Sequence, residues 1–162
     1  MISAWSGFFQ GELGTAATLA GLLFVSVSVN QVRILALGRM ADRGLEALTI
    51  LLLVVMVASV PLVPGQPVRL LGGEILILGA IALLITVILQ RTYMPLVEQP
   101  YRRGSMNMVF TSWAAVTLIA LAGAVMLWRG DEVGLYLLPV GILVSFVAAG
   151  INAWVLLVEI NR

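Results

Sequence analysis

Polar side chains recur along one side of the first long apolar segment of the chain. With successive residues turned by about 100° around a helix axis, six of them fall within an arc of roughly 120°. These six residues, called here the polar stripe, are Glu12, Thr15, Thr18, Ser26, Asn30 and Arg33. A stripe from a carboxylate to a guanidinium could line a narrow polar track across a membrane. It could equally hold helices together, because small and polar residues form the ordinary contacts between membrane helices.

Small residues precede the stripe and a second polar face follows near the end of the chain. Gly7 and Gly11 have the spacing that lets another backbone approach closely. On the last apolar segment one face carries Gly141, Ser145, Ala148, Asn152 and Glu159. If the two faces meet, Arg33 lies near the depth of Glu159, where opposite charges would pair. The alternative is that each helix shows its small residues to a different neighbour.

Glu74 is an ionisable residue about one turn inside a predicted membrane segment, after Gly72 and Gly73. Such a group is a functional candidate by default. In a ring of subunits, Glu74 or Glu12 would form an outer vestibule that concentrates cations at a pore mouth. The alternative is a carboxylate that stabilises the first turn of its helix and reaches the lipid headgroups.

Transmembrane helices are the elements that must position these residues. Of the 162 residues, 61% are hydrophobic and only 10% are charged, and the mean hydropathy is +1.09. Since about 20 apolar residues cross a hydrocarbon core of about 30 Å, five spans are predicted, at about 13–36, 45–63, 70–90, 107–128 and 133–158. We expect an all-α integral membrane protein, a single bundle of five helices. The longest predicted loop, 91–106, is the best site for a soluble partner.

Arginine placement predicts the direction of the bundle. One side holds the arginines at 33, 39, 43, 91, 102, 103 and 162, and the other side holds only Arg69 and Arg129. Because the basic residues of short loops stay in the cytoplasm, we expect the N-terminus outside and the C-terminus in the cytoplasm. The first residues, MISAWSGFFQGELG, lack the basic region of a cleavable signal peptide, so we expect them to be retained.

Composition also argues against most chemistries. Cysteine and histidine are absent, which removes thiolate nucleophiles, disulfides, Cys/His metal sites and the commonest proton shuttle at neutral pH. No pair of aspartates lies within a span, and no Gly-rich phosphate loop occurs. The net charge of +1 gives no electrostatic reason to bind nucleic acid. We therefore expect no enzymatic activity, no cofactor, no metal and no nucleic-acid partner.

A family resemblance adds to this reading. Trp5, Phe8-Phe9, Glu12 and the run GLLFVSVSVN followed by Arg33-Ile34-Leu35 together resemble the N-terminal half of a small uncharacterised family of bacterial inner-membrane proteins. Some members of that family are labelled "modulator of FtsH protease". The resemblance covers roughly the first half of the chain, through LEALTILLL and VPGQP. It implies a multi-pass protein of the bacterial inner membrane and a regulatory partnership with a membrane-bound AAA protease, and it supplies no catalytic residues.

Two functions are compatible with these features. The first is a non-enzymatic inner-membrane protein that self-assembles or binds and regulates another membrane complex, through the small and polar faces of its first and last helices. The second is a small homo-oligomeric ion channel in which the polar stripe, with Glu74, lines a water-accessible path. Both hypotheses require the lipid bilayer and a homo-oligomer or membrane-protein partner.

Overall fold

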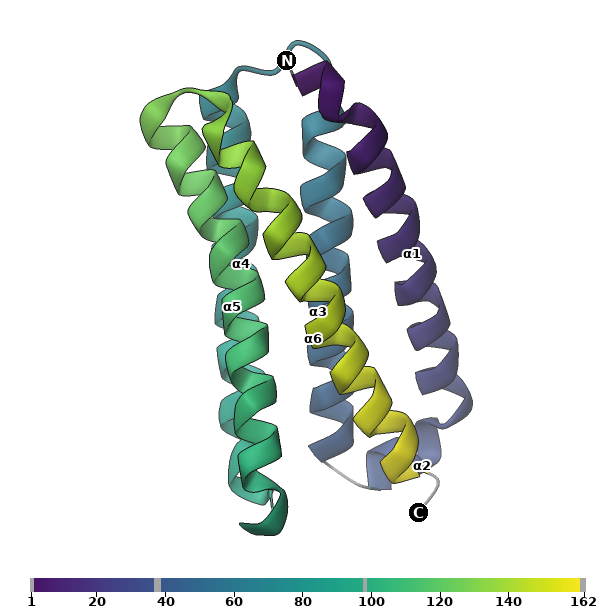
Figure 1. Cartoon of the computed structure of the whole chain (residues 1–162). Helices are drawn as coiled ribbons and strands as arrows, with labels where there is room; N and C mark the ends of the chain where they lie inside the picture. Colours follow the sequence, from purple (N-terminus) through teal and green to yellow (C-terminus); the bar gives the residue numbers. More distant parts are fainter. Residues whose placement is uncertain (1, 37–38, 98, 161–162) are drawn as a thin grey trace.

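A computed structural model of the chain describes residues 2–36, 39–97 and 99–160, and these residues form helices without any strand. The α-helices are α1 (Ser6–Val29), α2 (Gln31–Ala36), α3 (Arg39–Ser59), α4 (Val68–Tyr93), α5 (Gln99–Arg129) and α6 (Leu137–Ile160) (Figure 1). Short 3-10 helices stand between them: η1 (Ile2–Trp5), η2 (Val60–Leu62), η3 (Met94–Leu96) and η4 (Glu132–Tyr136). The predicted all-α fold is confirmed.

Five helical segments are long and apolar enough to cross a membrane: Ser6–Val29, Met40–Leu62, Val68–Leu96, Arg102–Arg129 and Glu132–Val158. The prediction of five membrane-spanning helices is confirmed on these grounds. The observed ends of these segments differ from the predicted ones. The first span was predicted at 13–36, whereas α1 begins at Ser6 and therefore includes Glu12. The expected long loop at 91–106 is wrong, since α4 continues to Tyr93 and α5 begins at Gln99.

Asn30 divides the segment that the sequence predicts as one helix. Its backbone N–H and its side-chain Nδ2 both donate to the Ser26 carbonyl oxygen, at 3.3 and 2.9 Å. Asparagine competes in this way with regular helical bonding, and its φ of −104° and ψ of 16° end α1. The short helix α2 then follows, with Ile34 N donating to the Asn30 carbonyl at 3.0 Å.

The bundle is organised around α3, which packs against α1, α4 and α6 (Figure 1). Helices α4 and α5 form an antiparallel hairpin on one side of it, α1 lies on the other side, and α6 crosses diagonally between them. Helix α1 packs mainly on α3 and touches α6 at few positions. The hypothesis that the first and last helices are close neighbours is therefore wrong for most of their length, because α3 supplies the surface on which α1 packs.

Glycines bring the backbones of α4 and α5 into contact. A Cβ atom added to Gly72 would lie 2.5 Å from the backbone nitrogen of Leu127, and one added to Gly123 would lie 2.5 Å from that of Leu76. Gly79 faces α5 in the same manner, with a nearest approach of 2.9 Å. We call Gly72, Gly79 and Gly123 the glycine seam. Its close approach is the packing that small residues permit between membrane helices.

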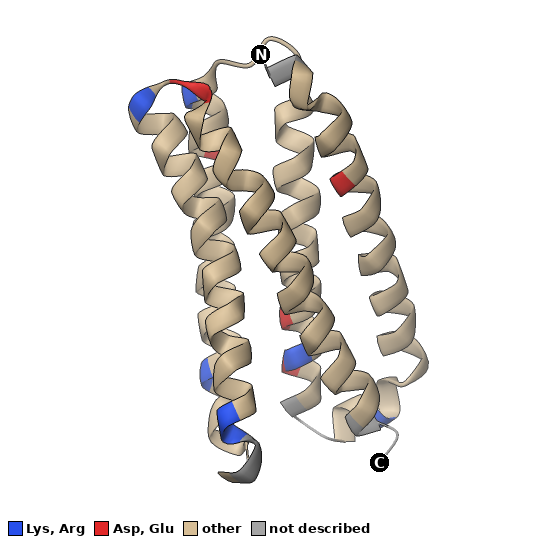
Figure 2. Cartoon of the chain, in the orientation of Figure 1, with Lys and Arg blue, Asp and Glu red and all other residues tan. Residues whose placement is uncertain are grey.

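Charged residues gather at the two ends of the bundle (Figure 2). The end at which α3 and α5 begin, called here the arginine-rich end, carries Arg33, Arg43, Arg91, Arg102 and Arg103, together with Asp42 and Glu46. The opposite end carries Arg69, Glu74, Arg129, Asp131 and Glu132. The apolar middles of the helices lie between these two levels, as a membrane requires.

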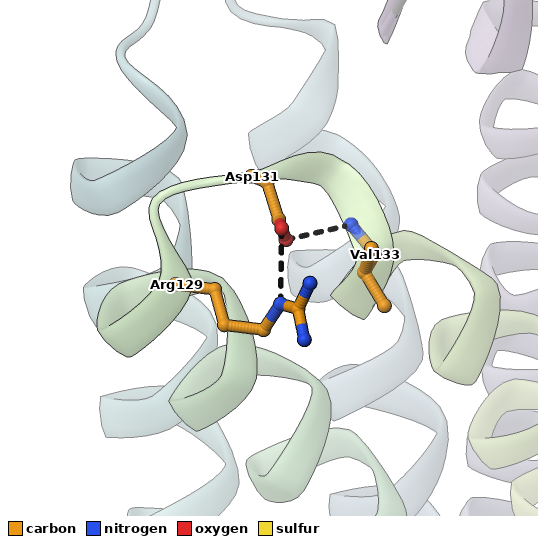
Figure 3. A network of polar contacts seen from close by, with 3 residues as sticks. All are labelled: Arg129, Asp131 and Val133. Carbon is orange, nitrogen blue, oxygen red and sulfur yellow. Dashed lines mark hydrogen bonds and ion pairs between the residues drawn. The ribbon is translucent and has the colours of Figure 1, made fainter.

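The turn between α5 and α6 closes the end opposite the arginine-rich one. Arg129 Nε lies 2.9 Å from Asp131 Oδ2, and Asp131 Oδ1 accepts from the backbone N–H of Val133 at 3.2 Å (Figure 3). Gly130 between them has a φ of +68°, which favours glycine. The hydrogen bond from Arg129 holds the pKa of Asp131 below its ordinary value. Asp131 thus serves as the N-cap of η4.

Candidate functional site

A fully buried carboxylate stands near the arginine-rich end. Glu46 of α3 has no exposed surface. Its Oε1 accepts a hydrogen bond from Gln90 Nε2 at 2.9 Å, and its Oε2 accepts one from the Tyr93 hydroxyl at 2.8 Å. Burying a charged or polar group is costly unless it is hydrogen-bonded, and here each carboxylate oxygen has a donor from α4. The contact therefore ties α3 to α4.

Helix α5 joins the same network. Trp113 Nε1 donates to Gln90 Oε1 at 2.6 Å. The amide of Gln90 thus bridges a buried carboxylate and an indole, since its nitrogen donates to Glu46 and its oxygen accepts from Trp113. Since Trp113 is 43% exposed, the chain of hydrogen bonds runs from the interior of the bundle to the surface of α5.

Arg43 lies one turn before Glu46 on α3 and is only 4% exposed. Its Nη2 donates to Ser105 Oγ at 2.7 Å, and its Nη1 lies 3.6 Å from Met108 Sδ. Its guanidinium carbon is also 5.0 Å from the centre of the Tyr93 ring, within the distance of a cation–π interaction. Arg43 therefore links α3 to both α4 and α5. Arg43, Glu46, Gln90, Tyr93, Ser105 and Trp113 are called here the Glu46 cluster.

Helical spacing explains why these residues meet. Arg43 and Glu46 stand three residues apart on α3, as do Gln90 and Tyr93 on α4, so each pair shares one face of its helix. On α3 this face continues into the buried Ala47 and Ile50. Because this face of α3 points into the core of the bundle, the side chains of Arg43 and Glu46 are buried there.

The role of Glu46 does not follow from the sequence alone. There Glu46 stands at the start of a predicted span, where a carboxylate would be expected to stabilise the first turn of its helix. In the structure α3 begins at Arg39, so Glu46 lies about two turns inside. The available signal was its position three residues after Arg43 and just before the apolar positions Ala47 and Ile50. That pattern places a charged pair on the side of the helix that must be buried.

A pocket of about 390 Å³ opens beside the cluster, between α3, α5 and α6. Its polar lining comes from Arg43, Ser105, Asn107 and Thr111. Its apolar lining is Met40, Val97, Met108, Ile151 and Val155. Arg43 lines this space and Glu46 does not. This space, called here the Arg43 pocket, combines a guanidinium and other polar side chains with apolar walls.

The polar stripe does not form a buried track within one chain. Thr15 and Thr18 are exposed, and their hydroxyls donate to the carbonyl oxygens of Gly11 and Gly14 on their own helix, at 2.9 and 2.8 Å. Arg33 is exposed as well, on α2.

The remaining stripe residues, Glu12, Ser26 and Asn30, are half-buried. Ser26 lines a groove between α1 and α6 whose floor is Leu51 of α3. Of the six stripe residues, Ser26 is the one that lines this groove together with residues of α6.

The polar face of the last helix turns toward the core. Asn152 is 1% exposed, and its Nδ2 donates to the Ala148 carbonyl at 3.2 Å. Its Oδ1 is buried and has no hydrogen-bond partner among the described residues. Glu159 belongs to α6, but its side chain lies outside the described residues. The expected pairing of Glu159 with Arg33 is therefore not described.

Glu74 is half-buried on α4 and accepts a hydrogen bond from Gln66 Nε2. Both residues line a surface hollow with Val63 and Pro67 of the preceding turn. The side chain of Glu74 therefore bonds to the turn before α4. Since α4 begins at Val68, Glu74 lies beyond the first turn in which a carboxylate would meet free backbone amides.

Small residues form an open face on α1. Gly7, Gly11, Gly14, Thr18 and Gly21 repeat at intervals of four and three residues, and all five are exposed. A Cβ atom added to any of the four glycines meets no atom of the described residues within 4 Å. At about 100° per residue this face points away from the core-facing side of α1, where the buried residues are Phe9, Ala16, Ala20 and Leu23. We call these five small residues the glycine face.

Within the described ranges, no group of three or more His, Cys, Asp or Glu residues could hold a metal ion. Comparisons of the chain with protein-family models, with curated proteins and with solved structures found no match. The features of the chain that bear on its function are therefore the Glu46 cluster, the Arg43 pocket and the glycine face.

Proposed function

We propose that this chain is a non-enzymatic, multi-pass protein of the bacterial inner membrane that assembles with itself through the glycine face of α1. In this proposal the assembled form binds and regulates another membrane complex. The observation that carries it is the open row of glycines on a helix long and apolar enough to span a membrane. The uneven distribution of arginines supports an N-terminus outside and a C-terminus in the cytoplasm.

The glycine face is better suited to contact with another helix than to contact with lipid. Lipid tails are as apolar as leucine, so membrane helices associate through van der Waals packing and close backbone approach rather than through hydrophobicity. A row of glycines leaves a shallow groove into which a second helix fits. Weak Cα–H···O contacts become available at that distance. The chain already uses this device between α4 and α5, where the glycines of the seam contact the facing backbone.

A second copy of α1 fits the groove because the glycine face is complementary to itself. Its small residues alternate at four- and three-residue intervals over four turns, the spacing of two helices that pack along a shared seam. Two-fold symmetry would place the same residues on both sides of the contact. The short connections between spans leave no separate soluble domain within the described chain to provide a contact instead.

The regulatory part of the proposal comes from the resemblance in the first half of the chain, which implies a membrane-bound AAA protease as partner. The residues that carry the resemblance, Trp5 to Leu35, lie in the segment that forms η1, α1 and α2. Assembly through α1 would then compete with, or create, the surface that the partner recognises. Co-purification with such a protease, compared between the wild type and Gly14→Leu, measures this coupling.

The proposed assembly is tested by single-molecule counting of labelled chains in lipid bilayers. We expect the wild type to form dimers or larger assemblies, and Gly14→Leu to weaken association at least about tenfold, equivalent to about 1.4 kcal/mol. Gly150→Leu on α6 is the matched control, because this glycine is also helical, exposed and open at its Cβ position. A wild type that stays monomeric, or equal association of all three proteins, would contradict the proposal.

A channel formed between copies is a second candidate, favoured by the position of Thr18 in the glycine face and of Thr15 beside it. Their hydroxyls bond to their own helix but keep acceptor lone pairs free for water. A flux assay in liposomes with Glu12→Gln and Glu74→Gln separates the two functions. Equal ion flux in protein-containing and empty liposomes would remove the channel, whereas conductance altered by either substitution would favour it.

A further inference from the structure

A carboxylate stands on the outer side of α4, at the end of the bundle opposite the arginine-rich one. We infer that the hollow around Glu74, called here the Glu74 hollow, binds phosphatidylethanolamine, with the primary ammonium beside the Glu74 carboxylate and one acyl chain along α4. The hollow is formed by η2, the turn after it and α4, and its described lining includes no residue of α1. The inference therefore does not depend on self-assembly through the glycine face.

Glu74 interrupts an apolar, exposed side of α4. Leu70 and Ile77, one turn before and one turn after it, are 54% and 60% exposed. The same side continues toward the other end of the helix with further exposed apolar residues, Ile81, Leu84 and Ile88. An ionisable side chain on the lipid-facing side of a span is costly unless it reaches the interface or a partner of opposite charge. Packing inside the bundle does not explain a carboxylate at this position.

The Glu74 side chain is directed toward the level of the lipid headgroups. In a helix the Cα–Cβ bonds tilt toward the N-terminus, and α4 begins at Val68. The carboxylate accordingly accepts a hydrogen bond from Gln66 Nε2, in the turn that precedes the helix. It thus lies where the helix leaves the apolar part of the span, which is the level of the headgroups in a membrane-spanning bundle.

Among the described residues, no arginine forms an ion pair with Glu74. Arg69 stands five residues earlier, about 140° around the helix. Its Nε lies 2.8 Å from the position of a Cβ atom added to Gly130, so its guanidinium lies against the turn between α5 and α6. Arg129 pairs with Asp131 in that turn. The cations at this end of the bundle are therefore directed away from the Glu74 hollow.

Gln66 provides a second acceptor at the same place. Its Oε1 is buried and has no hydrogen-bond partner among the described residues, whereas its Nε2 donates to Glu74. A buried carbonyl oxygen without a donor is costly. A primary ammonium has a positive charge and three N–H donors, so it can neutralise the carboxylate and still donate to another acceptor. The quaternary ammonium of a choline headgroup has the charge but no N–H group, which makes it the weaker ligand.

The walls of the hollow suit a lipid rather than a free amine. Its volume of about 640 Å³ lies within the range of small-ligand sites, about 300–1,000 Å³. Apart from Glu74 and Gln66 its lining is apolar, formed by Val60, Val63, Pro67, Leu70, Ile77 and Leu78. These walls continue into the exposed apolar side of α4, along which an acyl chain can lie. A small amine dissolved in water would gain nothing from them.

The test is native mass spectrometry of the detergent-purified protein titrated with dioleoyl phosphatidylethanolamine or dioleoyl phosphatidylcholine. We expect the ethanolamine lipid to bind at least about fivefold more tightly, the equivalent of one net hydrogen bond. Glu74→Gln removes the charge and one acceptor oxygen, so the two lipids should then bind about equally. Val63→Trp is the second variant, because Val63 is 53% exposed and lines the hollow. Its indole would obstruct the site and weaken binding of the ethanolamine lipid.

Two matched controls accompany these variants. Glu12→Gln changes another half-buried carboxylate that stands six residues after the start of its helix, as Glu74 does. Val140→Trp adds an indole at an exposed valine near the start of α6. Both should keep the preference for the ethanolamine lipid.

The inference is overturned if the wild type does not distinguish the two lipids. It is also overturned if Glu74→Gln and Val63→Trp, both folded by circular dichroism, bind them as the wild type does. Full displacement of the ethanolamine lipid by millimolar ethanolamine would overturn it as well, since the site would then recognise a free amine.

Discussion

The glycine seam and the glycine face are two uses of the same residue type in one bundle. At Gly72 and Gly123 a Cβ atom would come within 2.5 Å of the facing backbone, whereas at Gly11 and Gly14 it would meet nothing within 4 Å. The seam is a completed helix contact, and the face is an equally small surface without a neighbour among the described residues. The difference shows that composition identifies a helix able to pack closely but does not identify its partner.

The largest effect is expected at the seam. Gly123→Leu would force a branched side chain into the backbone of α4, because even a Cβ atom there lies 2.5 Å from Leu76 N. Overpacking against flexible side chains typically costs about 1–3 kcal/mol, and backbone cannot yield as side chains do. We expect almost no folded protein, measured as monodisperse yield by size-exclusion chromatography. A normal yield would show that α4 and α5 are not held together here.

The next effect is expected in the Glu46 cluster, which fastens α3 to the α4–α5 pair. Glu46→Ala would leave the Gln90 amide and the Tyr93 hydroxyl without their acceptor, at about 1–3 kcal/mol for each buried group. We therefore expect a loss of about 2–6 kcal/mol in a denaturation experiment in mild detergent. Glu46→Gln keeps one acceptor oxygen and should lose less. Equal stability of the wild type and Glu46→Ala would mean that water replaces the carboxylate.

Alanine substitutions compare the seam and the face directly. Gly72→Ala should destabilise the bundle, since its new methyl group would lie 2.5 Å from Leu127 N. Gly14→Ala should leave thermal stability unchanged or slightly increased, by about 0.5–1 kcal/mol, because alanine is the better helix former. Both are read from melting curves in the same detergent. Similar losses in the two variants would mean that α1 packs against the bundle through its outer face.

The smallest effect is expected in the turn between α5 and α6. Asp131→Asn removes the charge that contacts Arg129 and weakens the cap of η4. Because the pKa of Asp131 is lowered in the folded chain, its contribution is present at neutral pH and is lost as the pH falls below about 4. The small difference in melting temperature between the wild type and Asp131→Asn should therefore vanish in acid. A difference that persists at low pH would assign the effect to something other than this carboxylate.

The parts of the fold that follow from the sequence are those governed by composition and local chemistry. Long uncharged runs predict five spans, and a proline-glycine pair at 64–65 predicts the turn that follows η2, where Gly65 has a φ of +71°. The break at Asn30 was not predicted, because it depends on one side chain bonding to Ser26. The start of α5 at Gln99 was also not predicted. The polar residues of its first turns have the composition of a loop, so the sequence predicted a loop through residue 106.

The site was predicted less well because helix order decides it. The sequence indicates that the half with Gln90, Asn107 and Thr111 is the more polar one, and the Arg43 pocket lies there. It does not show that Glu46 of α3 contacts Gln90 and Tyr93 of α4, which lie 44 and 47 residues further along the chain. The polar stripe was predicted on one helix, but Asn30 ends α1 and Arg33 lies on α2. The surroundings of the stripe residues are set by the packing of α1 on α3, and the stripe residues alone do not indicate this packing.

The most direct measurement of the central claim uses the absence of cysteine from the chain. A single cysteine at Gly14, in the glycine face, is compared in native membranes with one at Ile77, which is 60% exposed on α4 and lies a similar number of residues from the start of its helix. Assembly through α1 predicts rapid oxidative cross-linking of Gly14→Cys chains into dimers and little for Ile77→Cys. Equal cross-linking at both positions, or none at Gly14→Cys, would contradict it.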